Sequence, residues 1–306
     1  MTTNKRNLYS RIKRSWQLYL ILLFPLLWLL IFKYGPMIGL QIAFRDYSPV
    51  GGIFHSRFVG LKHFRRFFQA PNFWQIIWNT LSLSAYLLIA NFPIPILLAL
   101  AINTCTRNKL VKVVQTVTYL PHFISVVVLV GMLMQFLNPI TGINGNICKL
   151  LGIKAVDYMA KPEMFRHLYV WSAIWQNAGW GTIIYLSTLA GVDPTLHEAA
   201  QVDGASRFKR VLNIDLPSIM PTAIIMLIMN AGKVMSIGFE KAFLMQNSLN
   251  ANTSEIIATY VYKRGLSAGG DYSYSTAIGL FNSIINIILI VIVNRIAKRH
   301  SETSLW

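Results

Sequence analysis

Acidic side chains are concentrated in one polar segment of this 306-residue chain, between residues 192 and 217. The segment holds four of the eleven acidic residues and three cations: Asp193, Glu198, Asp203, Asp215, Arg207, Lys209 and Arg210. Such groups can bind a partner through ion pairs. No cluster of His, Cys and acidic residues in the sequence has the pattern of a catalytic or metal site. The chemistry that we expect is therefore recognition, with no metal ion and no enzymatic activity.

The first half of the segment has the signals of a short helix. Asp193 can cap the helix and Pro194 suits its first position, so a helix is expected over 194–202. Three small residues on it and beyond it would let a partner approach closely: Ala199, Ala200 and Ala205.

A tight turn and a second helix should follow. Gly204 permits the positive φ of a sharp turn, and Ser206 can cap a helix that ends near Asn213. Pro217 suits the start of the next element. A helix, a tight turn and a second helix in succession are typical of a docking element, and a generic loop does not need them.

Long apolar blocks flank the polar segment. The chain is 54% hydrophobic and 13% charged, whereas a soluble domain carries about 25% charged residues. A membrane crossing takes about 20 apolar residues. We therefore predict an all-α, polytopic membrane protein with about six transmembrane helices, and reject a soluble enzyme. The blocks lie at about 18–40, 74–102, 113–137, 167–191, 218–238 and 275–294.

Lysine and arginine counts set the orientation. Fourteen lie in the segments expected to be cytoplasmic, and thirteen are spread over external segments of nearly twice the length, while Lys233 falls in an expected span. Both termini are therefore expected in the cytoplasm. The expected parts are a cytoplasmic tail at 1–15, a transmembrane domain at 16–294 that includes the loop at 192–217, and a cytoplasmic tail at 295–306.

The external loops should lie at 33–73, 138–166 and 239–274. The aromatic and basic stretch Phe58–Trp78 suits a helix at the membrane interface, or one packed on the bundle. The net charge of +17 indicates lipid head groups, not nucleic acid, as partners. Cys105 and Cys148 should lie on opposite sides of the membrane and cannot form a disulfide.

The energy source should lie in another protein. No acidic residue falls in an expected span, so the relay of a proton-coupled carrier is missing. Gly232 and Lys233 do not form a phosphate-binding loop, because Val234 follows them. Gly179 and Gly181 do not form a dinucleotide loop, since Ile184 stands where a third glycine belongs. An ion-driven secondary carrier or channel remains the rival to ATP-driven transport.

The polar segment resembles the EAA motif of permease subunits of ATP-binding-cassette importers, through Glu198–Ala200, Asp203–Ala205 and Ile214–Pro217. The resemblance implies a type I (MetI-like) permease fold among binding-protein-dependent inner-membrane components. It also implies a loop that couples to a separate ATPase, with ATP and Mg bound there and no cofactor in this chain. The implied coupling residues are Glu198, Ala199, Ala200, Asp203, Gly204, Ala205, Arg207, Ile214, Leu216 and Pro217.

The rest of the chain is similar to the LplB-like branch of carbohydrate importers, which move oligosaccharides or polysaccharide fragments. The resemblance implies a homologous second permease, two ATPase subunits and an extracytoplasmic sugar-binding lipoprotein as partners. The shared motif also fits a permease for a non-sugar solute. The branch resemblance is carried by Lys33–Met37, Ile42–Phe44, Tyr119–Ser125, Gly142–Asn144, Tyr272–Tyr274 and Ala277–Gly279.

Aromatic and amide side chains in the spans are candidates for a sugar path. Tryptophan also favours membrane interfaces, and asparagine often bonds neighbouring helices. Trp180 lies about 140° around the helix from Trp175 and should not share its path. A net external charge of +7 could steer an anionic sugar. The candidates are Trp171, Trp175, Asn177, Asn230, Asn282 and Asn286.

Overall fold

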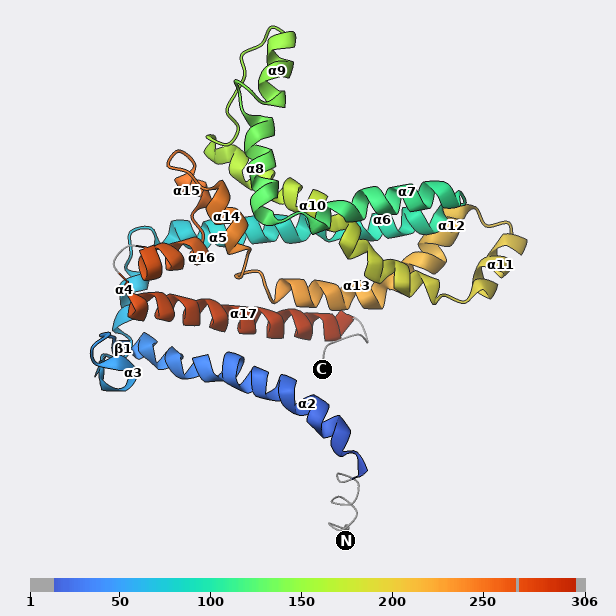
Figure 1. The fold of residues 1–306 in the computed structure, drawn as a ribbon. Coiled ribbons are helices and arrows are strands. Elements are labelled where there is room, and N and C mark those ends of the chain that lie inside the picture. Colours follow the sequence, from blue (N-terminus) through green and yellow to red (C-terminus); the bar gives the residue numbers. More distant parts are fainter. Residues whose placement is uncertain (1–13, 268–269, 301–306) are drawn as a thin grey trace. The chain divides into compact units, whose positions relative to one another are not determined.

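The fold is described from a computed structural model that covers residues 14–267 and 270–300 (Figure 1). The chain divides into two compact units, one made of residues 1–67 and 264–280 and the other of residues 68–263 and 281–306. Each unit is described separately.

The first unit begins with one long apolar helix, as expected. It comprises α2 (Trp16–Leu29), a π turn η1 (Leu30–Tyr34) and a 3-10 helix η2 (Gly35–Phe44). These 29 residues are long and apolar enough to cross a membrane. Their large apolar side chains are exposed in the isolated chain, as suits a surface that faces lipid.

A small hairpin follows this helix. Strands β1 (Arg45–Asp46) and β2 (Arg57–Phe58) pair antiparallel, with Arg45 opposite Phe58, and α3 (Gly52–His55) lies between them. Next comes α4 (Lys62–Phe68). The expectation of one interfacial helix over Phe58–Trp78 is wrong. Its start is a strand, and turn residues 69–72 separate α4 from the next long helix.

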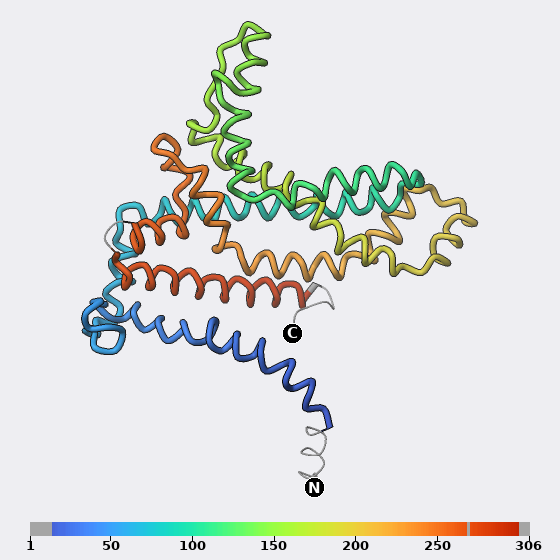
Figure 2. The backbone as a smooth tube through the Cα atoms, viewed as in Figure 1, coloured from blue at the N-terminus to red at the C-terminus, as the bar shows by residue number. Residues whose placement is uncertain are grey.

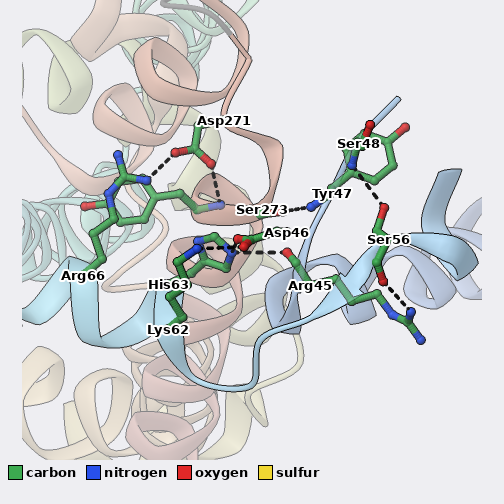
Figure 3. A network of polar contacts seen from close by, with 11 residues as sticks. Arg45, Asp46, Tyr47, Ser48, Ser56, Lys62, His63, Arg66, Asp271 and Ser273 are labelled. Carbon is green, nitrogen blue, oxygen red and sulfur yellow. Dashed lines mark hydrogen bonds and ion pairs between the residues drawn. The ribbon is translucent and has the colours of Figure 1, made fainter. Parts of the chain in front are cut away.

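Polar contacts tie this hairpin to the segment around Asp271 within the same unit (Figure 3). Lys62 Nζ lies 2.7 Å from Asp46 Oδ2, and Arg66 Nη1 lies 2.5 Å from Asp271 Oδ2. The Tyr47 amide donates to Ser273 Oγ at 2.8 Å. The hydrogen bond from Lys62 holds the pKa of Asp46 below its usual value. These bonds fix the loop after the first span.

The second unit begins with a broken helix. Helix α5 (Phe73–Asn91) and helix α6 (Pro93–Thr104) join at Phe92 into a 32-residue candidate span. Proline lacks the amide hydrogen that an uninterrupted helix needs. Pro93, the first residue of α6, therefore interrupts the helix at this junction.

The expected span at 113–137 is not one straight helix. Helix α7 (Asn108–Tyr119) continues as a 3-10 turn η3 (Leu120–Phe123), and helix α8 (Val126–Leu137) leaves it at a bend of 102°. Figure 2 shows this change of direction in the green part of the tube. Ser125 Oγ accepts from the Val128 amide at 3.3 Å, which starts a new helix at the bend.

Among the helices that lie wholly within this unit, α10 (Pro162–Ala190) is the longest. It packs on α5, α6, α7 and α13 (Leu216–Ala231). Before it, α9 (Ile143–Leu150) follows α8. Two buried apolar clusters on α10 form the core. One is centred on Val170 and Ile174, and the other includes Tyr185 and Leu189.

The remaining helices complete the chain. They are α11 (Pro194–Val202), α12 (Arg207–Arg210), the π turn η4 (Val211–Asp215), α14 (Phe239–Met245), α15 (Ala251–Ser254), α16 (Ile257–Tyr262), the π turn η5 (Lys263–Ser267) and α17 (Tyr272–His300). Helix α13 ends at Ala231, so the expected span at 218–238 is too long.

Length and composition support fewer than six spans among the residues described. Four helices qualify, or five if the bent pair α7–α8 counts as one. Helix α10 is 29 residues long, which is enough to cross the hydrocarbon layer. It does not qualify because its sequence is less apolar, with Arg166, His167 and Gln176 among its residues.

Candidate coupling loop and helix-break pocket

The polar loop at 192–217 begins as expected. Asp193 Oδ1 accepts from the Thr195 amide at 2.9 Å, and Pro194 is the first residue of α11. This hydrogen bond, with one from the Thr195 hydroxyl, lowers the pKa of Asp193. The helix cap is therefore ionised at neutral pH.

The turn after α11 depends on a glycine. Gly204 has φ +73°, a conformation that side chains with a Cβ rarely adopt. The Ala205 amide donates to Ala200 O at 2.8 Å, and the Gly204 amide donates to Gln201 O at 3.0 Å. These two bonds form a Schellman motif, which satisfies the last carbonyls of the helix.

The second helix of the loop does not end near Asn213, contrary to expectation. Ser206 caps α12 through the Lys209 amide at 3.4 Å, as predicted. Beyond it, η4 carries the chain without a break into α13, so 207–231 is one helix. Pro217 cannot donate to the carbonyl one turn earlier. The π turn accommodates this missing bond, and Ser218 Oγ donates to Ile214 O at 2.7 Å.

A buried carboxylate attaches the loop to α6. Asp215 has a side chain that is 4% exposed, with His197 Nε2 at 3.2 Å from its Oδ1. Asn103 Nδ2, at the end of α6, donates to the same oxygen at 3.3 Å. The sequence places Asp215 in the motif but does not reveal these two distant partners.

The outward face of the loop carries the predicted coupling residues. Glu198, Ala199, Asp203, Gly204, Arg207 and Pro217 are exposed, and Ala200, Ala205, Ile214 and Leu216 are half-buried. Two apolar side chains that we did not predict accompany them. Val202 is 89% exposed and Phe208 is 70% exposed. Apolar side chains on a charged loop are typical of a surface that a partner covers.

The three tryptophans on α10 lie in two different environments. Trp171 and Trp175 are about half exposed and line one apolar pocket of about 410 Å³ against α8. Trp180 stacks on His122 instead, with ring centroids 4.5 Å apart. The structure therefore separates Trp180 from the other two, as the helical angle predicts.

Asn177 helps to hold the bend between α7 and α8. Its Oδ1 lies 3.0 Å from His122 Nδ1, and its Nδ2 donates to Ala173 O at 2.9 Å. Gln176 Nε2 reaches Ile124 O at 2.7 Å. The amide of Asn177 thus has internal partners that account for its presence.

The other candidate asparagines lie near the end of α13. Asn230 lines a polar pocket beside α5. The Oδ1 atom of Asn286 accepts from the Met235 amide at 3.0 Å, and its Nδ2 donates to Ser236 Oγ at 2.7 Å. Asn282 has a buried Oδ1 atom with no hydrogen-bond partner in the part of the chain described.

These features define a class of protein, namely a multi-pass helical membrane protein with a structured, charged loop between two of its helices. Residues 91–302 match the family described as "Binding-protein-dependent transport system inner membrane component". The chain belongs to this family, and so it is an inner-membrane component of a transport system.

Curated relatives match over nearly the whole chain. Protein LplB of Bacillus subtilis (strain 168) is 42% identical over 297 residues, which cover 97% of this chain and 93% of LplB. The polygalacturonan/rhamnogalacturonan transport system permease protein YteP of the same organism is 41% identical over 302 residues. That match covers 99% of this chain and 94% of YteP.

A solved structure also matches. It is the crystal structure of a bacterial alginate ABC transporter in complex with an alginate pentasaccharide-bound periplasmic protein. One of its chains superimposes with a TM-score of 0.89 and 40% sequence identity, covering 97% of this chain and 99% of that one. The permease fold expected from the sequence is confirmed.

Proposed function

We propose that this chain is the permease subunit of an ATP-binding-cassette importer of oligosaccharides or polysaccharide fragments. The observation that carries the proposal is the exposed face of the loop at 192–217, built on an ordered helix and turn. The matched permease for polygalacturonan and rhamnogalacturonan and the alginate transporter structure support a glycan as the cargo.

The proposed assembly contains a homologous second permease, which makes a heterodimer, two ATPase subunits and an external sugar-binding lipoprotein. ATP and Mg bind in the ATPase, and this chain is non-catalytic. Both termini lie in the cytoplasm. This orientation places the loop at 192–217 on the ATPase side of the membrane.

Coupling requires the loop to contact the ATPase differently before and after nucleotide binding, since only a difference in contacts shifts an equilibrium. Glu198 and Arg207 offer charges, and Val202 and Phe208 offer apolar area. The Schellman turn at Gly204 fixes the angle between the two helices that present them. In the sugar path, we retain Trp171, Trp175 and Asn230, which face pockets.

The test is Gly204→Pro. Proline holds φ near −65° and cannot adopt the φ of +73° at this turn. We expect normal membrane insertion and loss of ATP-driven oligosaccharide uptake in vesicles that contain the whole complex. Gly204→Asn is the matched control, since asparagine tolerates positive φ, and it should retain most of the uptake. Normal uptake by Gly204→Pro would refute the assignment.

A further inference from the structure

Helix α13 stops inside an apolar block. Its last helical residue is Ala231, and residues 232–238 form turns and irregular backbone before α14 begins at Phe239. Irregular backbone at membrane depth is tolerated only where protein buries it or where it lines a water-filled cavity. In transporters, interrupted helices often supply the ligand site. The end of α13 therefore calls for an explanation.

Side chains from two other helices hold this irregular segment. From α17, Asn286 bonds the Met235 amide at 3.0 Å and Ser236 Oγ at 2.7 Å. From α10, the Tyr169 hydroxyl donates to Gly238 O at 3.3 Å. These hydrogen bonds hold the segment in one conformation, so it is not a frayed helix end.

The segment and the end of α5 enclose a pocket of about 210 Å³, which is far larger than the space that one water molecule needs. Apolar walls come from Leu87, Leu88, Phe92, Val234 and Ile237. The polar lining comes from Ser84, Asn91, Asn230, Lys233 and Ser236. A cation, hydroxyls and amides therefore meet beside apolar walls.

Two of the polar atoms in this pocket are buried and unpaired. Ser84 is 5% exposed, and within the described residues neither Ser84 Oγ nor Asn91 Oδ1 has a hydrogen-bond partner. A buried polar atom without a hydrogen-bond partner destabilises the folded protein unless a ligand or water supplies the bond. Both atoms suit a ligand that carries hydroxyl groups, because Asn91 Oδ1 accepts and a serine hydroxyl can donate or accept.

Lys233 adds an uncompensated positive charge. None of the salt bridges formed by the described residues involves Lys233. The position just after the end of α13 favours a cation, since the helix dipole is negative there. Lys233 is exposed and lines the pocket, so its ammonium group is free to meet a ligand that enters there. A carboxylate on that ligand would form a charge-assisted hydrogen bond with it, which a neutral sugar would not.

We propose that this pocket binds an acidic sugar unit of the cargo, whose carboxylate pairs with Lys233. Ser84 and Asn91 bond the sugar hydroxyls, and the apolar walls face the C–H surface of the ring. The proposal rests on the proposed function and narrows its cargo to oligosaccharides that contain uronic acid. It also gives the permease a part in selecting the cargo.

The experiment measures equilibrium binding of tetragalacturonate to the purified complex of both permeases and the ATPase in lipid nanodiscs, without the binding lipoprotein. Lys233→Gln should raise the Kd at least about tenfold, the value of one charge-assisted hydrogen bond. Lys233→Arg keeps the charge and should stay within about threefold. Lys154→Gln removes the same charge from an exposed position and should leave the Kd unchanged.

The neutral methyl ester of the same tetramer tests the pocket without any mutation. The wild-type complex should bind it at least about tenfold more weakly than the acid, and Lys233→Gln should bind both alike. Equal Kd values for the acid in wild type and Lys233→Gln would overturn the carboxylate site, as would no binding of the acid to wild type.

ATP-driven uptake separates this inference from the proposed function. ATP-driven uptake of a neutral oligosaccharide by the wild-type complex, with no binding of the acid to that same complex, would overturn the inference alone. A wild-type complex that imports no oligosaccharide would refute the proposed function, and this inference with it.

Discussion

The loop after α11 and the bend between α7 and α8 both turn the chain sharply, but by different means. In the loop, neighbours in sequence make the turn: Asp193 caps α11, Gly204 closes the Schellman motif and Ser206 caps α12. At the bend, the side chains of Gln176 and Trp180 come from α10, more than fifty residues further along the chain.

The difference explains why one turn was predictable and the other was not. Capping residues act over three or four positions and can be read directly from the sequence. A bend of 102° inside an apolar block leaves only Pro121 and Ser125 as local signals, and neither fixes its angle. The distant partners on α10 are visible only once the helices pack.

The largest effect should follow from breaking the contact beside the bend, at Gly179. A Cβ atom on this residue would lie 2.1 Å from Thr118 O on α7, so the two helices could not stay in place. We expect Gly179→Ala to lower the free energy of unfolding by about 3 kcal/mol, seen as a lower midpoint of thermal unfolding in detergent.

Gly131→Ala on α8 is the matched control for this change. No atom lies within 4 Å of its added Cβ, and alanine is the better helix former by about 1 kcal/mol. Its midpoint should be unchanged or slightly raised. Equal midpoints for Gly179→Ala and wild type would show that α7 and α10 need no close contact.

A smaller effect should follow at Asp215, whose side chain bonds the loop to Asn103 at the end of α6. Asp215→Ala removes the acceptor of both His197 and Asn103, weakening the attachment by about 2 kcal/mol. We expect faster hydrogen exchange over α11 and about tenfold slower ATP-driven uptake at unchanged expression. Asp215→Asn keeps one acceptor oxygen, so its exchange and uptake rates should lie between those of wild type and Asp215→Ala. Unchanged exchange in Asp215→Ala would mean that the local caps suffice to hold the loop.

The smallest effect should come from the local cap itself. Asp193→Ala removes the acceptor for the Thr195 amide, and exchange in the first turn of α11 should rise about fivefold. Asp193→Asn can still cap and should behave like wild type. If Asp193→Ala raised hydrogen exchange over the whole loop as much as Asp215→Ala does, the local helix cap and the long-range contact of Asp215 would not differ in how much of the loop they hold.

The same cap gives a pH dependence of defined sign. The lowered pKa of Asp193 means that its cap stabilises α11 fully above the usual value of 3.8, and that this contribution is lost as the pH falls through the lower folded value. Titration of Asp193 should therefore not change the protection of the first turn of α11 against hydrogen exchange between pH 6 and 8, once the pH dependence of the intrinsic exchange rate is subtracted. A change in protection there would implicate a different group.

Most of the fold followed from apolar block lengths, and most of the loop from its capping residues. The sequence did not predict the early end of α13 at Ala231, because Met235 and Ile237 continue the apolar block. Only Asn286, on a helix some fifty residues later, shows why the backbone can leave the helix there. Lys233 was visible as a cation next to an apolar block, but the unpaired Ser84 and Asn91 beside it required the packed structure.

The helix from Arg207 to Ala231 is continuous, so a movement imposed at one end would be carried to the other, as in a lever. At about 1.5 Å per residue it is about 37 Å long, with the outward face of the loop near one end and the pocket around Asn230 at the other. A tilt of about 10° about its first residue moves its last turn by about 6 Å, roughly the pitch of one helical turn. The π turn at η4 preserves this stiffness past Pro217, where a break would have left a hinge.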